Sequence, residues 1–565
     1  MSSHPRNQSS GASNMAGDRL LRWFDRTILD LGRQFRWSYL PPLMVYLSAG
    51  ISGLTGIVGT FFVKDYLGLS AEFLAALGFW TMLPWTLKMV AGHVVDLIWR
   101  HKAGLIYLGA ALIAASLLIM QRLLADPAGM RSVMPAETWY VISVMLAPIG
   151  FMLQDVVADA MTVEAVSKND ADGQPLSEEQ LRLAHTTMQT LGRIAIIGGT
   201  LVIALTNVFL FKGVDAMSEV QKVEVYQTIY RLALLIPFIS VLGVLYARWL
   251  RWEEENRLAA QGYEFEDIER LLARPLDEAP AINWWLLGGG LGFVLFSAVM
   301  GLAALPFNEE IVFAGSLAIV TFLIWRLTLT LETDTRRTLF GTALVIFVFR
   351  AMPSPGASST WWMIDVLGFD QQFLSELALI TSTLTLLGMF VFRRYMAEHS
   401  IGDIVVLLTI ALTVLFLPNL AMYYGFHHWT AAVTGGVVDA RFIALVDTAL
   451  ESPLGQVAMI PMLAWIAHSA PRELKATFFA VMAAFTNLAL SLSQLLTKYL
   501  NQIFTVSRAT KDAATGSVTM LADYSELGGL FWAVVVIGLV VPLATVHLVR
   551  RRLMVSESAR TFRHG

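Results

Sequence analysis

The chain contains no cysteine and few charged residues. Without cysteine, disulfide bonds, thiolate nucleophiles and cysteine-ligated metals are excluded. Charged residues make up 15% of the chain, whereas a soluble globular protein carries about 25%. The net charge of −4 over 565 residues gives no basic surface of the kind that binds nucleic acid.

The sequence also lacks a phosphate-binding loop, a nucleotide-binding fold, a catalytic triad and metal-ligand spacing among its ten histidines. ATP-driven transport and enzyme activity are therefore not expected. Neither a cofactor nor a bound metal is predicted.

Long hydrophobic runs are abundant instead. Hydrophobic residues make up 56% of the chain, and apolar runs of about 20 residues, each long enough to cross a bilayer, recur along its length. Their helical periodicity predicts an all-α polytopic membrane protein. Window hydropathy gives about fourteen spans, near 41–63, 71–98, 103–122, 138–163, 183–210, 229–250, 283–305, 310–331, 338–364, 373–392, 402–424, 440–466, 475–498 and 528–549.

Arginine and lysine are concentrated in alternate loops, such as "FRRYMAEH" at 392–399. By the positive-inside rule, the N- and C-termini are cytoplasmic and the protein lies in the cell membrane, the inner membrane if the source is bacterial. No signal peptide is recognised, and the first 16 residues are polar. Residues 17–37 mix arginine with apolar residues, which predicts either an amphipathic surface helix or a positively charged flank.

One long polar segment, 251–281, divides the spans. Six spans precede it, and six follow if the pair at 283–331 is an insertion, so two repeated halves around a central site are predicted. The predicted division is a cytoplasmic tail 1–38, an N-terminal six-helix half 39–250, a linker 251–281, two additional helices 282–332, a C-terminal six-helix half 333–550 and a cytoplasmic tail 551–565.

A loop pattern follows the second span. Gly92, Asp96 and Arg100 form G-x-x-x-D-x-x-x-R, which resembles the loop signature of the major facilitator superfamily. Glycine permits close helix packing, and the two charges are expected to latch one conformation at the inner rim. The sequence departs from the signature at Leu97 and Trp99, so the latch is expected to be altered.

Four further stretches occur in a defined order: "PWTLK" (84–88), "QDVVADA" (154–160), "LGFDQQFL" (367–374) and "PML" (461–463) with a later "PRE" (471–473). Together they resemble the folate–biopterin transporter family, over about 40–250 and 338–500. The resemblance implies a secondary carrier that moves a folate- or pterin-like organic anion with protons by alternating access.

Three charges lie at a similar depth in neighbouring spans. Lys88, Asp155 and Arg193 are each about ten residues from a cytoplasmic end, or roughly 15 Å deep, near the bilayer midplane. Such charges predict either a functional cluster or a static salt-bridge network. Asp159 lies one turn from Asp155 on the same helix face, so the two carboxylates cannot both ionise cheaply and one is expected to carry the coupling proton.

Arg350 precedes "AMPSPGASST", which cannot continue a regular helix in lipid unless it lines a cavity. The first span has four glycines at the matching position, and interrupted spans in both halves indicate the binding site. Arg350, Arg193 and Lys88 suit an anionic substrate. Trp361 is expected either to stack on a flat ligand or to belong to an interfacial aromatic belt.

Asp447 and Glu451 lie one turn apart in a late span. They are interpreted as an outer counter-charge or a second protonatable site, or else as members of a pair with Arg441 or with a neighbour near the outer rim. The expected partners of the protein are the organic anion, protons and lipid, with the protein itself a monomer.

Two other functions stay open. Fourteen spans and the stretch at 153–160 are also similar to the muropeptide permease family. A non-transporting membrane assembly factor of the same fold is the third alternative.

Overall fold

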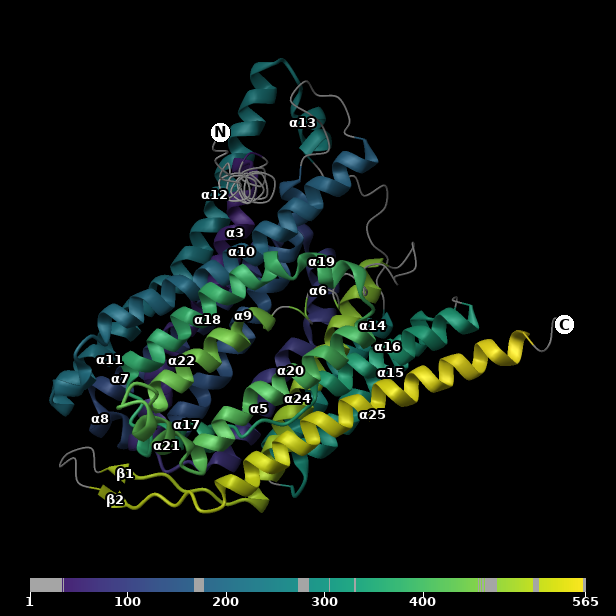
Figure 1. Cartoon of the computed structure of the whole chain (residues 1–565). Helices are drawn as coiled ribbons and strands as arrows, with labels where there is room; N and C mark the ends of the chain where they lie inside the picture. The colour runs from purple at the N-terminus through teal and green to yellow at the C-terminus, as the bar shows by residue number, and fades with distance from the viewer. Residues whose placement is uncertain are drawn as a thin grey trace, which may run out of the picture.

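The computed structural model of the chain is almost entirely α-helical (Figure 1). It describes residues 33, 35–166, 177–272, 284–303, 305–329, 332–455, 457, 459, 462, 475–511 and 518–561. The strands of this part are β1 (Thr510–Lys511) and β2 (Val518–Met520), which pair as a short antiparallel hairpin. The side of the helical layer that carries this hairpin is called the distal side below, and the positive-inside pattern predicts that it faces outward.

Within the described residues, ten helical stretches are long and apolar enough to cross a membrane. The membrane character is therefore confirmed, while a count of fourteen is not established. The ten are Trp37–Tyr66, Ala71–Leu97, Ala103–Ala125, Ala136–Thr162, Thr187–Leu210, Glu219–Ala260, Asn308–Arg326, Gln371–Val391, Ile401–Tyr423 and Leu527–Arg551.

The other four predicted spans also coincide with helices. α14 (Trp284–Leu302) has only a short apolar core, α16 (Thr333–Arg350) is separated from α17 (Ala357–Asp365) by a non-helical stretch, and α22 (Ala440–Glu451) is short. α24 (Lys475–Ile503) is long, and its first six side chains lie outside the described part.

Local capping sets where several helices begin. Ser70, Asp370 and Asp439 accept hydrogen bonds from the amides of Phe73, Phe373 and Phe442, respectively. Each side chain satisfies one amide that the first helical turn leaves without a partner. The helices that begin there are α5 (Ala71–Thr86), α18 (Gln371–Val391) and α22.

The N-terminal half packs through glycine contacts. Its elements are α3 (Leu40–Gly50), η3 (Ile51–Thr55), α4 (Gly56–Tyr66), α5, α6 (Lys88–Leu97), α7 (Ala103–Ala125), α9 (Ala136–Ala165), α10 (Glu178–Leu210), α11 (Glu219–Ala233) and α12 (Leu235–Ala260). A Cβ on Gly109 of α7 would lie 2.6 Å from the Gly150 oxygen of α9. A Cβ on Gly50 of α3 would lie 2.2 Å from the Ile196 oxygen of α10. Small residues let these backbones approach closely, which is how membrane helices associate without a hydrophobic driving force.

The C-terminal half contains α16, α17, α18, α20 (Ile401–Tyr423), α22, α24 and α25 (Leu527–Thr561). It meets the N-terminal half mainly where α24 packs on α5 and α18 packs on α10. Gly78 of α5 makes room for Gln494 of α24, since a Cβ there would lie 2.6 Å from the amide oxygen. The helices of the two predicted halves therefore pack against each other along these two pairs.

The two additional helices, α14 and α15 (Asn308–Leu327), lie against both halves. Gly290 of α14 packs on Val90 of α6, and α15 packs along α24. Lys498 of α24 lies 3.3 Å from Glu309 of α15, and the Trp80 indole of α5 donates to the same carboxylate over 3.4 Å. The insertion is thus tied to both halves.

The described residues include only part of the predicted termini and linker. The proposed surface helix at 17–37 falls almost entirely outside the described residues. In the linker, α12 continues to Ala260 and α13 spans Phe265–Leu272. α25 continues to Thr561, beyond the predicted end of its span near 549.

Candidate functional site

A break in the second span positions Lys88. Pro84 lies inside α5, which ends at Thr86, and α6 starts at Lys88. Proline removes an amide donor and clashes with the preceding turn, so it kinks a helix. The "PWTLK" stretch therefore places the lysine at a bend, where its side chain reaches α9.

Lys88 binds two carboxylates of α9, those of Asp155 and Asp159. Its Nζ lies 2.5 Å from Asp155 Oδ2 and 2.7 Å from Asp159 Oδ2. The hydroxyl of Tyr46, from α3, donates to Asp159 Oδ1 over 2.6 Å. The predicted proximity of Lys88 and Asp155 is observed, and both carboxylates share one ammonium.

Exposure differs between the two carboxylates. The side chain of Asp155 is 15% exposed, and that of Asp159 is 43% exposed. Asp159 is thus the more exposed member of the pair, while Asp155 is largely buried.

Arg193 of α10 completes the charge balance of this cluster. It lies close enough to interact electrostatically with Asp155 and Tyr46. Two cations and two carboxylates sum to zero charge. A neutral cluster has the lowest free energy in a low-dielectric interior, because each unpaired charge there costs several kcal/mol.

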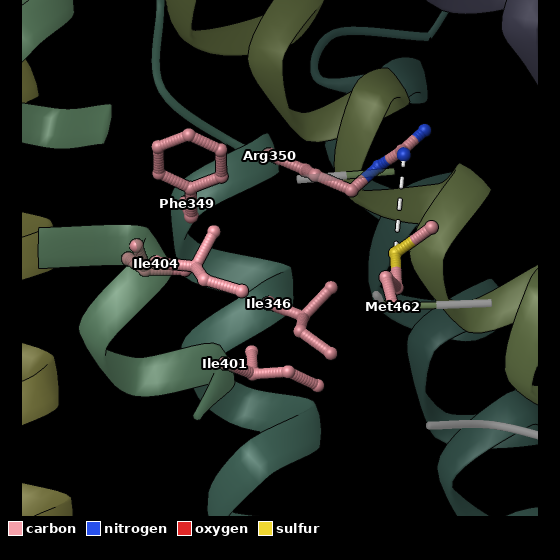
Figure 2. A pocket seen from close by; sticks show the side chains of 7 residues that line it. Ile346, Phe349, Arg350, Ile401, Ile404 and Met462 are labelled. Carbon is pink, nitrogen blue, oxygen red and sulfur yellow. Dashed lines mark hydrogen bonds between the residues drawn. The ribbon is translucent and has the colours of Figure 1, made fainter. Parts of the chain in front are cut away.

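Arg350 lies in a separate, apolar pocket. Ile346, Phe349, Arg350, Ile401, Ile404, Val405 and Met462 line it. The guanidinium points away from the isoleucines toward Met462 (Figure 2). Its Nη1 donates to the thioether sulfurs of Met459 at 3.3 Å and Met462 at 4.0 Å. Thioether sulfur is a weak acceptor, and no carboxylate pairs with Arg350, nor does its Nε have an acceptor, within the described ranges.

The chain break after Arg350 is supported by one face of α24. Ser493 donates to the Met352 oxygen over 2.7 Å, and Thr497 accepts from the Ser354 amide over 3.0 Å. One turn further, Asn501 accepts from Ser358 over 2.5 Å. Four-residue spacing puts these three α24 side chains on one helix face. They satisfy backbone and side-chain groups that lipid could not satisfy, so the "PSPG" break is tolerated at membrane depth.

A larger cavity lies in the distal part of the N-terminal half. It measures about 550 Å³ and is lined by η3, α4, α5, α7, α9, the α11–α12 region and the start of α17. Its polar lining consists of hydroxyl groups, among them Thr55, Tyr140 and Thr360, and none of the described residues that line it is charged. Gly56 and Gly59 of the interrupted first span form part of its wall.

Trp361 lines this cavity and is 2% exposed. Its interpretation as an interfacial belt residue is therefore wrong, because the ring is buried. It does not lie with Lys88 and Arg193, so the predicted substrate-binding residues do not form one contiguous pocket in this conformation.

Asp447 and Glu451 are in different environments. Asp447 is 8% exposed and its Oδ2 accepts from Asn419 of α20 over 2.8 Å. Its Oδ1 has no partner among the described residues, while Glu451 is exposed. Arg441 pairs with Asp370 at 2.8 Å rather than with Asp447, so the neighbour that Asp447 contacts is Asn419.

The latch residues lie at the end of α6 and in η4 (Trp99–His101). Asp96 and Arg100 both take part in polar or electrostatic interactions. A Cβ on Gly92 would meet no described atom within 4 Å. Close packing is therefore not what requires glycine there in this conformation, and the latch itself stays a prediction.

Sequence reasoning missed Tyr46, Lys64, Asp365 and Arg508. Lys64 and Asp365 could have been noticed as charges at the ends of apolar runs, in "FFVKDY" and "WWMIDV". Tyr46 and Arg508 had no such signal, because their importance comes from contacts with residues distant in the chain.

Comparison with known proteins supports this reading of the sequence. Residues 294–557 match the model of the BT1 family. A folate-biopterin transporter of Synechocystis sp. is 21% identical over 472 residues, which cover 83% of this chain and 76% of that protein. The resemblance to the folate–biopterin transporter family is thereby confirmed, and the relatives indicate a membrane transporter rather than an enzyme.

Solved structures show the same fold. A peptide transporter POT in complex with sulfate has a TM-score of 0.54 at 14% identity, covering 91% of this chain and 94% of that chain. A POT family transporter in complex with 5-aminolevulinic acid has a TM-score of 0.56 at 10% identity, covering 91% and 96%. At such identities the similarity concerns the fold alone, which is of the major facilitator type.

Proposed function

We propose that this chain, which resembles the folate–biopterin transporter family, is a membrane transporter that carries a folate- or pterin-like organic anion together with protons by alternating access. The observation that carries the proposal is the ammonium of Lys88 shared between Asp155 at 2.5 Å and Asp159 at 2.7 Å. The same cluster provides cations for a substrate carboxylate and carboxylates for a proton.

Charge balance supplies the coupling in this proposal. Lys88 and Arg193 together balance Asp155 and Asp159 when no substrate is bound. If a substrate carboxylate takes one of the cations, one aspartate is left without a counter-charge in a low-dielectric site. Uptake of a proton by that aspartate restores neutrality, because an unpaired buried charge is the costly state. Asp159 is better suited to exchange the proton, since its side chain is the more exposed of the two.

Arg350 is proposed to bind a second anionic group of the substrate. Its guanidinium is held by weak sulfur acceptors, so a carboxylate could form two stronger hydrogen bonds with it. Trp361 and the distal cavity are proposed to receive an uncharged part of the substrate. Asp447 is a further candidate for a protonatable group in the C-terminal half.

The proposed cycle requires the two halves to rock about the site. Asp96 and Arg100 are proposed to latch the cytoplasmic rim, so Asp96→Asn should change the balance of inward- and outward-open states without abolishing binding. Distance measurements between spin labels on the two halves would test this role.

The proposal is tested by uptake into proteoliposomes. Labelled folate should accumulate in response to an inward proton gradient with the unaltered protein and fail to accumulate with Lys88→Ala. Lys222→Ala is the matched control, because Lys222 pairs with Glu219 on an exposed surface at 3.1 Å. Uptake of a muropeptide instead of folate would overturn the substrate assignment. Failure to transport folate, pterin and muropeptide alike would favour the assembly factor.

A further inference from the structure

Arg508, in the loop between α24 and α25, inserts its side chain into the N-terminal half. Arg508 Nε donates to the Lys64 oxygen over 2.7 Å, and its two terminal nitrogens donate to the Leu69 and Leu67 oxygens. These carbonyls belong to the C-terminal end of α4 and to the loop that leads to α5. A single side chain of one half thus holds three backbone groups of the other.

This arrangement fits the chemistry of a helix end. The last carbonyls of a helix lack amide partners within the helix, and the negative end of the helix dipole favours a cation. Guanidinium presents several donors in a planar fork, which an ammonium cannot reproduce. Arg508 is only 3% exposed, so little water is available to replace these hydrogen bonds.

A second contact joins the same two halves. Lys64 Nζ lies 2.5 Å from Asp365 Oδ1 at the end of α17. The other oxygen, Oδ2, accepts from the Tyr524 hydroxyl over 2.6 Å and from the Ala509 amide over 3.2 Å. Burial and the hydrogen bond to Asp365 raise the pKa of Tyr524 above its usual range, so Tyr524 keeps its proton and remains a donor at physiological pH.

These residues also border the distal cavity. The Arg508 guanidinium lies 4.5 Å from the centroid of the Trp361 ring, and Trp361 lines the cavity. The ring therefore lies between the arginine and the cavity, as part of its wall.

We propose that Lys64, Asp365 and Arg508 form a distal clasp, which closes the cavity from the distal side and must open before solute can exchange there. Other contacts between the halves are found on the same side, since Gln371 donates to Tyr226 over 2.7 Å and Gln502 donates to Glu72 over 2.5 Å. Arg508 is the central member, because it alone of the three binds backbone of the opposite half through three donors. The proposal concerns the gate and does not depend on which solute is carried.

The natural absence of cysteine makes the test direct. Gly59 lines the cavity, and a Cβ there would meet no described atom within 4 Å, so Gly59→Cys introduces one thiol into open space. A membrane-impermeant maleimide is added to the distal face of vesicles of known orientation, and the labelling rate is measured without substrate. Adding Arg508→Gln should raise that rate by roughly tenfold or more, which corresponds to about 1.4 kcal/mol or more of lost closure energy.

Arg441→Gln is the matched control. Arg441 is also an arginine on the distal side, but both of its partners, Asp370 and the Gly368 oxygen, belong to its own half. Its removal should leave the labelling rate unchanged.

Two further variants keep the test decisive if Arg508→Gln does not fold. Arg508→Lys retains the positive charge but not the planar set of donors. Asp365→Asn removes the ionic partner of Lys64 in the other half and leaves only Asp65 of its own half, at 3.1 Å. Each variant should therefore raise the rate by a smaller factor. Labelling no faster than in the Arg441→Gln protein, in folded clasp variants, would overturn the proposal. That outcome would leave the proposed proton-coupled transport untouched, because uptake is measured separately.

Discussion

Asp159 Oδ1 and Tyr46 are joined by a 2.6 Å hydrogen bond between α3 and α9, while Oδ2 of the same aspartate faces Lys88 at 2.7 Å. One carboxylate thereby links three helices of the N-terminal half. A change in the charge of Asp159 therefore alters its interactions with both the first span and the bend at Lys88. Protonation of this carboxylate is in this way connected to helix position.

Lys88→Ala should lower stability. It leaves Asp155 and Asp159 facing one another without the shared ammonium, and removing one partner of a buried ion pair costs about 3 kcal/mol or more. The melting temperature in detergent should fall, and Asp155→Asn made alongside should partly restore it. Lys222→Ala, at an exposed pair, should leave the melting temperature nearly unchanged. An unaltered melting temperature in Lys88→Ala would contradict the importance of this cluster for the fold.

Asp159→Asn should separate exchange from accumulation. The neutral side chain keeps the size of the carboxylate and can still accept from Tyr46, but it cannot carry a proton. Substrate exchange across proteoliposomes should persist, while accumulation driven by a proton gradient should be lost.

The same pair of assays on Asp155→Asn identifies which carboxylate carries the proton. Tyr46→Phe is the control, because it removes the hydrogen bond and leaves both carboxylates titratable. If both asparagine variants accumulate substrate like the unaltered protein, neither aspartate couples transport to protons.

Arg350→Ala should abolish ligand binding without loss of the fold. The guanidinium has no carboxylate partner among the described residues, so its removal breaks no ion pair there. The melting temperature without ligand should therefore be unchanged or higher, and the stabilisation by added folate should disappear. Arg326→Ala is a suitable control, since that arginine stacks on Trp285 in the additional helices. A full ligand-induced shift in the Arg350→Ala protein would rule out the assignment.

Gly199→Ala should destabilise the packing of α10 on α3. A Cβ at Gly199 would lie 2.8 Å from Gly50 backbone atoms, and neither backbone can yield without separating the helices. Overpacking of this kind costs about 1–3 kcal/mol. Its neighbour supplies the control, because a Cβ on Gly198 would meet no described atom within 4 Å. Equal melting temperatures for Gly198→Ala and Gly199→Ala would contradict the close helix contact.

The sequence by itself determined the membrane-spanning class and the major facilitator type of fold. In lipid, a long apolar run can satisfy the hydrogen bonds of its backbone only by forming a helix. Hydropathy therefore located the helices. It also indicated the Lys88–Asp155 pair, because a charge in an apolar run needs a partner at its own depth. The same reasoning found the interruption after Arg350, since proline and glycine in lipid-depth segments disturb a helix wherever they occur.

Only the tertiary structure decided which charges meet across the two halves. Sequence spacing measures depth along a helix but not rotation about its axis, so Trp361 could not be assigned to the cavity wall, nor Asp447 to a buried contact with Asn419. Arg508 lies in a loop, and neither hydrophobic periodicity nor window hydropathy predicts the contacts of a loop residue. Its insertion against the end of α4 depends on the packing of helices more than 400 residues apart in the chain, and that packing is set by shape complementarity, which no local pattern encodes.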